Sequence, residues 1–465
     1  MIPTTLRDVA VRSGGTLHPD DAAVDLLIDG PVVTDSREAG PGSLYVARMG
    51  EHADGHAYVG AARDRGAVAA LTSRVVDELP CVVVDDVQAA FGRVARGVVD
   101  RAPHLTVVAV TGSSGKTSTK DLLAQVLAAA GETVAPVNSL NGEIGVPLTV
   151  CRVTPATRFL VAEMGARGIG HLAYLTTIAP PDVSIVLNVG VAHVGEFGSK
   201  QAVAQAKGEL VEALRPEGLA VLNADDPEVA KMRSRTRARV VTVGSSADAD
   251  IRAVDVRLDA LSRATFTVVT PGGSVEIALG LSGAHHVGNA LAVVATALEC
   301  GMPLADVATA LTGARSASRW RMEVHERPDG VTVVNDAYNA NPDSMHAALE
   351  ALQTIGGEER RTWAVLGEML ELGELSRTEH ERVGRWVAEL DTDRLVVVGA
   401  GASALADGAT RAGGATEVTA VADADEAYEL LQSQLRPGDV VLLKSSRDAG
   451  LRWLGDRLAG IEVPA

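Results

Sequence analysis

Short runs of apolar residues alternate along the chain with longer stretches in which apolar positions recur every three or four residues. The continuous runs are typical of strands that are buried on both faces of a sheet. They cover residues 105–110, 159–162, 183–187, 219–222, 331–334, 363–366, 395–398 and 440–443. Helical spacing marks residues 118–130 and 199–214. This alternation predicts an α/β fold built on open, mostly parallel sheets with helices on both faces.

One stretch does not follow the alternation. Residues 249–281 are rich in Thr and Val, contain Pro271-Gly272-Gly273 and show little helical spacing. β-branched residues interrupted by a Pro-Gly turn are typical of hairpins. We therefore predict an antiparallel insert here.

Two short segments indicate domain boundaries. Asp100–Pro103 comes just before the first long apolar run, and residues 313–318 are mostly small. A chain of 465 residues corresponds to three domains at about 150 residues per domain. We predict domains of residues 1–103, 104–313 and 314–465.

The charge balance excludes whole classes of function. The chain has 60 Asp and Glu against 42 Lys and Arg, a formal net charge of −18. This argues against a protein that neutralises nucleic-acid phosphates or an anionic membrane surface. Aromatic residues make up only 3%, so the cores must consist mainly of Ala, Val and Leu.

Cysteine usage and the N-terminal residues point to a reducing compartment. Cys81, Cys151 and Cys300 are far apart, which predicts neither a disulfide framework nor a zinc ribbon. The first residues lack the basic and apolar regions of a secretory signal. No apolar run approaches the roughly 20 residues needed to span a bilayer. We expect a cytoplasmic protein with no membrane insertion and no nucleic-acid partner.

The strongest chemical signal is a glycine-containing loop between a strand and a helix. Val-Val-Ala-Val at 107–110 leads into Thr-Gly-Ser-Ser-Gly-Lys-Thr-Ser at 111–118. The glycines let backbone N–H groups approach phosphate oxygens, and the helix start adds partial positive charge. Lys116 can reach the β- and γ-phosphates, and the Thr117 hydroxyl can ligate Mg²⁺. The general pattern has a further glycine where this chain has Val110, so the loop is a shortened one. The alternative is a glycine turn without a ligand.

Polar side chains follow neighbouring strands of the same predicted sheet. Glu163 ends one strand, Asn188 ends the next, and His193 follows shortly after. Ligands of open α/β sheets lie beyond the carboxyl ends of the strands, so these groups point toward the phosphate loop and suit a metal site. The alternatives are a solvated or helix-capping carboxylate and an ordinary loop histidine.

Lys207 occupies an unexpected position. It lies on the apolar stripe formed by Val203, Leu210 and Leu214 in the helical stretch 199–214. A lysine that points inward is costly unless it is paired or modified. The alternative is a lysine at the margin of the stripe, with its amine reaching solvent.

The C-terminal third carries a second polar turn. Val-Thr-Val-Val-Asn at 331–335 leads into Asp336, and Asn339 and Asn341 follow before a predicted helix. These residues suit ribose or phosphate contacts, and equally Asx turns and a helix N-cap. Arg319 and Arg321 lie at the predicted domain boundary, where an arginine could reach a γ-phosphate on domain closure or could lie on the surface.

These motifs together resemble the Mur ligases, ATP-dependent enzymes that form amide bonds in peptidoglycan precursor synthesis. The resemblance covers nearly the whole chain. It is greatest for the branch that adds D-alanyl-D-alanine. The strings that carry it are Asp-Ser-Arg at 35–37 with Gly-His at 55–56, Asn-Gly-Glu-Ile-Gly-Val-Pro at 141–147, Asn-Asp-Ala-Tyr-Asn-Ala-Asn-Pro-Asp-Ser-Met at 335–345, and Val-Leu-Gly-Glu-Met-Leu-Glu-Leu-Gly at 365–373. Gly142, His286 and Ser445 depart from the usual family pattern at their positions.

The resemblance implies three α/β domains. These are a small N-terminal domain for a UDP-sugar, a central phosphate-loop domain for ATP, and a Rossmann-like C-terminal domain. It implies nucleotide contacts from Gly112, Ser113, Ser114, Gly115, Lys116, Thr117, Ser118, Asn289, Arg319 and Asp336. It implies substrate contacts from Ser36, Arg37, Asn141, Asn339 and Asn341. Lys116, Glu163, His193 and Lys207 would be catalytic, with Thr117 on one Mg²⁺ and Glu163, His193 and Lys207 serving a second. The lysine matching Lys207 is carbamylated in the family.

The implied reaction has two steps. ATP phosphorylates the terminal carboxylate of UDP-N-acetylmuramoyl-tripeptide, and the amine of D-alanyl-D-alanine then attacks the acyl phosphate. Both substrates are small molecules, and we expect a monomer.

The related ligase that adds the third amino acid is an alternative function, but the Asp-Asn-Pro-Arg string of its diaminopimelate version does not occur here. Folylpolyglutamate synthase lacks the Asp-Ser-Arg type of N-terminal domain. A P-loop ATPase without ligase activity would usually carry an Asp where this chain has Glu163.

Overall fold

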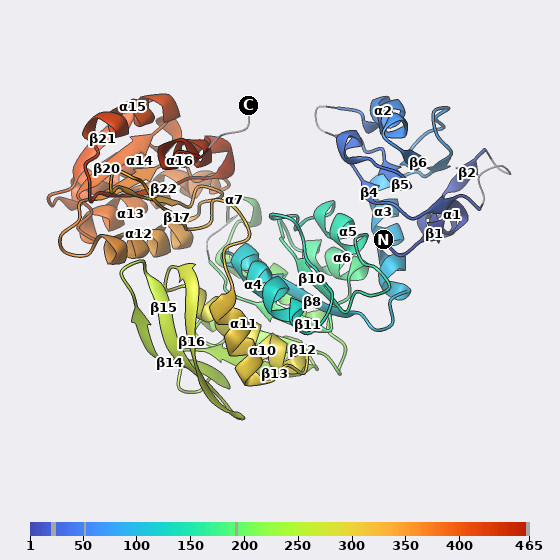
Figure 1. Ribbon diagram of the computed structural model, residues 1–465, viewed down its shortest axis with the longest axis horizontal. Coiled ribbons are helices and arrows are strands. Elements are labelled where there is room, and N and C mark those ends of the chain that lie inside the picture. Colours follow the sequence, from blue (N-terminus) through green and yellow to red (C-terminus); the bar gives the residue numbers. More distant parts are fainter. Residues whose placement is uncertain (20–24, 51–52, 191–193, 462–465) are drawn as a thin grey trace.

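The computed structural model describes residues 1–19, 25–50, 53–190 and 194–461. Its strands form three main sheets, of five, nine and six strands, in successive parts of the chain (Figure 1). Helices cover these sheets, which confirms the α/β class. A further two-stranded sheet pairs β1 with β3.

The central sheet positions the phosphate loop. Its strand order is β16-β15-β14-β13-β12-β11-β8-β10-β9, and it is parallel from β9 to β14. The strands are β8 (Thr106–Thr111), β9 (Thr133–Val134), β10 (Phe159–Glu163), β11 (Val183–Val186), β12 (Leu219–Asn223), β13 (Arg239–Gly244), β14 (Ile251–Leu258), β15 (Arg263–Thr270) and β16 (Gly273–Ser282). The loop after β8 therefore lies between the ends of β10 and β11.

The predicted antiparallel insert is confirmed, and it extends this same sheet. β14, β15 and β16 form a meander, and β14 continues the parallel part through the pair Val243↔Ile251. The surrounding helices are α4 (Lys116–Ala128), α5 (Gly145–Val150), α6 (His171–Ile178), α7 (Val194–Phe197), α8 (Lys200–Glu212), α9 (Pro227–Ala230), α10 (His286–Glu299) and α11 (Leu304–Gly313), with the 3₁₀ turn η3 (Lys231–Arg235).

Successive residues of β8 enter different cores. Val107 and Ala109 belong to one apolar cluster, whereas Val108 and Val110 belong to another on the opposite face of the sheet. A strand that is buried on both faces needs an apolar residue at every position. This is the reason that the central strands read as continuous apolar runs.

The N-terminal part docks on the central part through apolar contacts. Its sheet order is β2-β7-β6-β5-β4, and α3 packs against α5 and α6 within one shared core that includes Phe91 and Leu172. Its elements are β1 (Thr4–Thr5), α1 (Leu6–Ser13), β2 (Thr16–His18), β3 (Leu27–Ile28), β4 (Val32–Val33), η1 (Ser36–Glu38), β5 (Ser43–Val46), η2 (Gly55–Tyr58), α2 (Val59–Asp64), β6 (Ala67–Thr72), β7 (Cys81–Val83) and α3 (Val87–Asp100).

The C-terminal part is a six-stranded sheet with a core on each face. Its order is β17-β18-β22-β19-β20-β21, with only β17 antiparallel. Its elements are β17 (Glu323–Glu326), β18 (Thr332–Asn335), α12 (Pro342–Gly356), β19 (Thr362–Leu366), η4 (Gly373–Leu375), α13 (Ser376–Glu389), β20 (Arg394–Val398), η5 (Ala400–Ala402), α14 (Ala404–Ala412), β21 (Glu417–Val421), α15 (Ala424–Gln434), β22 (Val440–Lys444), η6 (Arg447–Ala449) and α16 (Leu451–Ala459).

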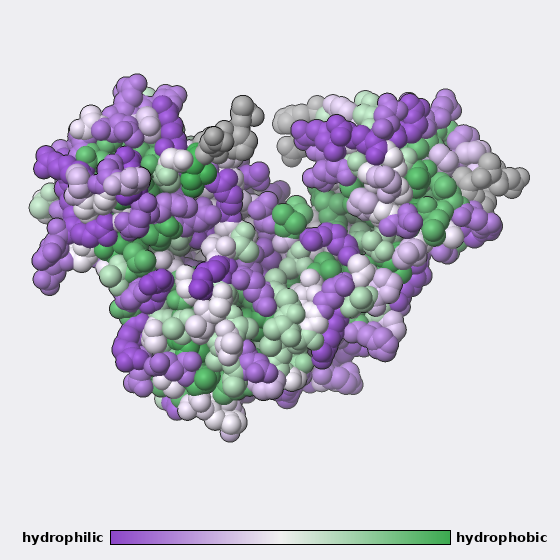
Figure 2. Space-filling model, in the orientation of Figure 1, coloured by the Kyte–Doolittle hydropathy of each residue, from purple (hydrophilic) through white to green (hydrophobic). Residues whose placement is uncertain are grey.

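The two outer parts lie at opposite ends of the central part. Figure 2 shows a hollow between them, above the central part. The surface on both sides of the hollow is mostly hydrophilic in this view. Among the described helices, none is long and apolar enough to cross a membrane.

Helix α4 carries the phosphate loop, so its packing should set the stability of the central part. Leu122 of α4 is completely buried. We expect Leu122→Ala to lower the free energy of unfolding by about 2–5 kcal/mol, because the side chain leaves a cavity that the core fills only in part. Urea denaturation measures this, with Leu258→Ala, which is 39% exposed, as the matched control. Equal stability of the two variants would contradict the packing argument.

Candidate active site

A cavity of about 920 Å³ lies where the three parts of the chain meet. The N-terminal part contributes Arg48 and Gln88 to its lining, the central part contributes the phosphate loop, and the C-terminal part contributes Asp336 and Asn339. The carboxyl ends of β8, β10 and β11 face it, which is the usual place for a ligand in an open α/β sheet. The cavity is therefore the candidate active site.

The phosphate loop has the backbone conformation that its glycines predict. Gly115 has φ +80° and comes immediately before α4. A Cβ atom at this position would lie 2.8 Å from the Oδ1 atom of Asn289. Glycine is required here both for its backbone conformation and for this close approach. Asn289, expected to contact a nucleotide, thus lies directly against the loop.

Asn188 holds the loop from the next strand. Its Oδ1 accepts a hydrogen bond from the Ser114 backbone N–H at 2.9 Å, and its Nδ2 donates to the Ser114 carbonyl oxygen at 3.3 Å. The Asn188 carbonyl oxygen accepts a third bond from the Ser113 N–H at 3.2 Å. The position of Asn188 at the end of its strand therefore lets its side chain shape the loop.

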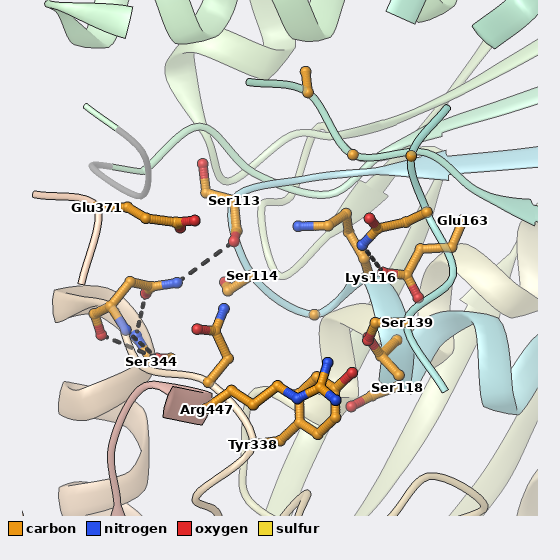
Figure 3. A pocket seen from close by; sticks show the side chains of 18 of the residues that line it. Ser113, Ser114, Lys116, Ser118, Ser139, Glu163, Tyr338, Ser344, Glu371 and Arg447 are labelled. Atoms are coloured by element: carbon orange, nitrogen blue, oxygen red, sulfur yellow. Dashed lines mark hydrogen bonds between the residues drawn. The ribbon is translucent and has the colours of Figure 1, made fainter. Parts of the chain in front are cut away.

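Lys116 lies among charges of both signs. Its Nζ donates to the Gly112 carbonyl oxygen at 2.7 Å. Burial lowers the pKa of its amine, whereas the carboxylates of Glu163 and Glu371 act to raise it. Figure 3 shows Glu371, from the C-terminal part, on the side of the loop opposite Glu163. The amine is placed to contact an anion that enters the loop.

Thr117 faces an arginine from the domain boundary. Its Oγ1 lies 2.8 Å from the Ser139 hydroxyl oxygen and accepts from the Nη2 of Arg321 at 3.3 Å. Arg321 lines the cavity, and its Nε is buried without a hydrogen-bond partner. Ser118 also lines the cavity, beside the loop (Figure 3).

The prediction that Arg319 reaches the nucleotide does not agree with this structure. Arg319 forms an ion pair with Asp456 at 3.0 Å and does not line the cavity, whereas Arg321, two residues later, does. In an irregular backbone the spacing of two arginines does not reveal which one faces inward. That choice is made by the buried carboxylate of Asp456.

One carboxylate oxygen of Glu163 accepts a hydrogen bond, and the other has no hydrogen-bond partner. Its Oε1 accepts a hydrogen bond from the Asn141 Nδ2 at 2.7 Å, and its Oε2 is buried without a partner. Register places Glu163 opposite Val110, directly before the loop. A buried carboxylate oxygen without a donor is costly unless a cation or proton binds there. The alternatives of a solvated or capping carboxylate are wrong.

Lys207 points inward, as its place on the apolar stripe predicts. It is 4% exposed and lines the cavity, and within the described ranges it has no hydrogen-bond or ion-pair partner. Burial, with a contribution from Lys116, lowers the pKa of its amine well below the usual value. The alternative of an amine that reaches solvent at the edge of the stripe is therefore wrong.

The predicted metal ligands are Thr117, Glu163, His193 and Lys207. His193, the third predicted ligand, lies outside the described residues. The parts of the chain that are described contain no group of three His, Cys, Asp or Glu able to hold a metal ion. Glu163 Oε2 and the Thr117 hydroxyl nevertheless lie at the same cavity.

The C-terminal polar turn reaches the same cavity. Asp336 accepts from the Lys444 Nζ at 2.5 Å and from the Met322 N–H at 3.1 Å. Lys444 also donates to the Asn339 carbonyl oxygen at 3.1 Å. Burial lowers the pKa of the Lys444 amine even though Asp336 acts to raise it. The pair fixes the turn in place beside the phosphate loop.

Asn341 combines both roles that its position allows. Its Oδ1 caps α12 by accepting from the Ser344 N–H at 2.9 Å, so the N-cap alternative is confirmed. Its Nδ2 also donates to the Ser113 carbonyl oxygen at 3.5 Å, across the boundary between two parts. Together with the bond from Arg321 to Thr117, this contact joins the C-terminal part directly to the loop.

Ser36 and Arg37 do not line this cavity. Ser36 is buried, while the Arg37 side chain is 82% exposed and pairs with Asp35 at 2.6 Å. Hydrogen bonds from Arg37 lower the pKa of Asp35 to about 2. A site at these residues would be separate from the phosphate loop. Arg48 is the N-terminal arginine that faces the cavity.

A smaller cavity of about 210 Å³ adjoins the first. The two share the lining residues Asn188, His285 and Asn289, and the remaining lining is mainly apolar, from β11, β12, β13 and α10. An apolar slot with an amide and an imidazole at its mouth suits a flat heterocycle. Burial lowers the pKa values of both His285 and the adjacent His286.

Several lining residues were not predicted from the sequence as contacts. Arg48, Lys444 and Glu371 lie far from the loop in sequence, and only the packing of the three parts places them at one cavity. The apolar run 440–443 does place Lys444 at the end of a parallel strand. That position is the one sequence signal for Lys444, because ligands of open α/β sheets lie beyond the carboxyl ends of the strands.

Comparison with known proteins gives a consistent result. Residues 31–110, 110–297 and 320–447 match, in turn, the descriptions "Mur ligase family, catalytic domain", "Mur ligase middle domain" and "Mur ligase, glutamate ligase domain". The UDP-N-acetylmuramoyl-tripeptide–D-alanyl-D-alanine ligase of Mycobacterium tuberculosis is 47% identical over 98% of both chains. The enzyme of that name from Escherichia coli is 36% identical over 86% of both.

Solved structures agree with these sequence relatives. MurF from Acinetobacter baumannii has a TM-score of 0.89 with 32% identity, covering 98% of this chain and 99% of its own. MurF ligase from Thermotoga maritima, solved in complex with ADP, has a TM-score of 0.80 with 27% identity, covering 93% and 98%. All three parts of the chain therefore have counterparts in known proteins.

The hydrogen bonds of Asn188 should set how well the loop is formed before a nucleotide binds. We expect Asn188→Ala to weaken ADP binding about tenfold or more, since two side-chain bonds of about 1 kcal/mol each are lost. Isothermal titration calorimetry with ADP measures this. Gln353→Ala removes an amide that bonds Thr392 in the C-terminal part and should bind ADP normally. Unchanged affinity in Asn188→Ala would show that the ligand itself orders the loop.

Proposed function

The chain belongs to the Mur ligase family, and from this premise we propose that it joins D-alanyl-D-alanine to UDP-N-acetylmuramoyl-tripeptide at the expense of ATP. The observation that carries the proposal is one cavity that contains a phosphate loop, a carboxylate with an open oxygen and an inward lysine. The names of the relatives supply the substrates. The product is a peptide bond in a precursor of peptidoglycan.

In this proposal each of the three parts has a different role in binding the reactants. Residues 1–103 bind the UDP-sugar, with Ser36 and Arg37 at that site. Residues 104–313 bind ATP, and residues 314–465 close over the reacting groups. Arg48 and Gln88 support this arrangement, because they bring the N-terminal part to the cavity that holds the phosphate loop. Asn141, Asn339 and Asn341 would contact the peptide substrates from the same cavity.

The nucleotide binds along the loop and into the smaller cavity. The loop from Gly112 to Ser118 binds its phosphates through the N–H groups at the start of α4 and the Lys116 amine, and the purine enters the slot beside Asn289. Asp336 holds the C-terminal turn at the nucleotide. Arg321 takes the phosphate contact first expected of Arg319, because Arg321 lines the cavity and Arg319 does not.

Two Mg²⁺ ions fit the donors at the cavity. The Thr117 hydroxyl suits the first, and the open Glu163 Oε2 supports the second, together with His193 and a modified Lys207. Bound metal would neutralise charge on the phosphates and the carboxylate. The buried Glu163 oxygen is the strongest support, because it has no protein donor.

Carbamylation would explain why the Lys207 side chain is buried. A neutral amine adds CO₂ to form a carbamate and releases one proton, which converts the uncharged side chain into an anionic ligand. The lowered pKa of Lys207 favours the neutral amine that this reaction requires. An unmodified ammonium without a partner would be costly at this depth.

The reaction follows from the arrangement of charge. The substrate carboxylate attacks the γ-phosphorus of ATP, the bond to the bridging oxygen breaks, and ADP leaves. The amine of D-alanyl-D-alanine then attacks the acyl carbon and expels inorganic phosphate. Lys116 and Arg321 offset the repulsion between two anionic reactants and hold them in line. Closure by the C-terminal part keeps water from the acyl phosphate.

The chain by itself can complete this site. Residues from all three parts of the chain line the cavity, and a monomer is the oligomeric state that we propose. Its three cysteines are free, which supports a reducing compartment such as the cytoplasm.

Phosphate release from ATP tests the proposal. We expect release in the presence of UDP-N-acetylmuramoyl-tripeptide to depend on D-alanyl-D-alanine, because its amine is the second nucleophile. Diaminopimelate and glutamate, each with the corresponding shorter UDP-linked substrate, serve as comparison amines. Release that follows one of those amines would identify a different ligase of the family, and release with ATP alone would identify an ATPase.

The carbamate has its own test. We expect Lys207→Ala to lose most activity, on the order of the 10²–10³-fold typical for removal of one transition-state-stabilising group, and to regain part of it with a short carboxylic acid. The group's folded pKa is lowered, so the amine is neutral above that pKa and protonated below it. Wild-type activity should therefore fall as pH decreases through the folded pKa of Lys207, and bicarbonate should restore it only above that value. A fully active Lys207→Ala variant would rule out the carbamate.

A further inference from the structure

Four residues at the start of the C-terminal part, Arg319–Met322, are held by two opposite sets of contacts. Arg319 and Trp320 bond to Asp456 on α16. Met322 donates its N–H to Asp336. Arg321, between these anchors, faces the other way and reaches Thr117 and Ser139 of the central part. The segment therefore joins the body of the C-terminal part to the phosphate loop.

Asp456 is the main anchor. It is completely buried. Each oxygen of its carboxylate accepts a hydrogen bond from the Trp320 Nε1 at 3.0 Å, and the carboxylate forms an ion pair with the Arg319 Nη2 at 3.0 Å. A fourth contact comes from the Asn335 Nδ2 at 3.3 Å. A buried carboxylate with this many donors is rigidly oriented. Its partners are oriented with it.

Trp320 is held by two aromatic neighbours. Its ring stacks with Tyr338 at 6.3 Å and meets the Trp453 ring edge-on at 5.0 Å. Trp320 has φ +59° and Met322 has φ +50°. Bulky residues rarely adopt this left-handed backbone, and such positions persist only where surrounding contacts impose them. The two left-handed residues flank Arg321 and turn it toward the loop.

Arg321 has capacity left for an anion. Its guanidinium lies 4.4 Å from the centre of the Tyr338 ring, and its Nη2 contacts the hydroxyls of Thr117 and Ser139 at 3.3 and 3.4 Å. Its Nε is buried and has no partner. An arginine placed in this way can stabilise charge on a transferring phosphoryl group.

We propose that Asp456 is a positioning residue that acts through Arg321. By holding Arg319 and Trp320 it imposes the turn that presents Arg321 to the γ-phosphate, and so it links the rigid C-terminal sheet to the phosphate loop. This inference rests on the proposed function, because it requires phosphoryl transfer at the loop. It assigns Arg319 the role of an anchor for that turn.

A double-mutant cycle separates this role from a merely structural one. We expect Asp456→Asn to lower kcat about 10- to 100-fold with the KM for ATP nearly unchanged, since a misplaced catalytic group affects the transition state more than ground-state binding. We expect Arg321→Ala to lower kcat by about 10²–10³-fold. In the Arg321→Ala background, Asp456→Asn should have no further effect on kcat.

Two more variants keep the test decisive if Asp456→Asn is unstable. Arg319→Ala removes the same ion pair from its exposed end and should lower kcat in the same direction, again only when Arg321 is present. Asp425→Asn is the matched control: its carboxylate is exposed and pairs with Arg457 of the same helix α16 at 2.9 Å. That control should keep wild-type kcat. Thermal unfolding of each variant reports whether it is folded.

The inference would be overturned if the effects of these substitutions on kcat multiply with the effect of Arg321→Ala. If Asp456→Asn and Arg319→Ala reduce kcat by the same factor with and without Arg321, they act by a route that does not involve it. A rise in the KM for ATP as large as the fall in kcat would also overturn it, and so would a fall in kcat in the Asp425→Asn control. Absence of ATP turnover with D-alanyl-D-alanine in the wild-type enzyme would instead be a failure of the proposed function, and the two results are therefore distinguishable.

Discussion

Positive charge gathered at one cavity is the constraint on which the arrangement of this molecule depends. The reaction proposed for the chain brings a carboxylate toward a triphosphate, and two anions repel strongly when they leave water. Lys116, Arg321 and Lys444 lie at one cavity, and burial lowers the pKa of both lysines. The C-terminal part and the central part must meet for these groups to act together.

The overall charge of the chain has the opposite sign. A net charge of −18 describes the solvated surface, whereas binding depends on local groups at the sheet edges. Asn188 shapes the phosphate loop, and Asn341 carries a hydrogen bond from the C-terminal part to Ser113. These neutral contacts hold the loop in shape at no cost in net charge. An acidic protein can in this way bind acidic substrates.

The strand–loop–helix unit was predictable because all of its determinants are local. Continuous apolar residues define β8, Gly115 permits the left-handed turn, and the helix begins at Lys116. The inward lysine was predictable for the same reason, since Lys207 lies on a stripe that its own helix defines. Arg319 and Arg321 were not distinguishable. They lie in an irregular segment where no period applies, and a carboxylate 135 residues or more away decides their directions.

The sequence by itself determined the α/β class, the antiparallel insert, the phosphate loop and the family resemblance, because periodicity and short motifs depend on neighbours along the chain. Only the tertiary structure decided which side chains share a cavity. It placed Arg48, Glu371 and Lys444 at the cavity that contains the loop, and Arg37 outside that cavity. It also left Glu163 Oε2 buried and open. Contacts between distant segments depend on how three sheets pack, and that packing is a property of the whole core.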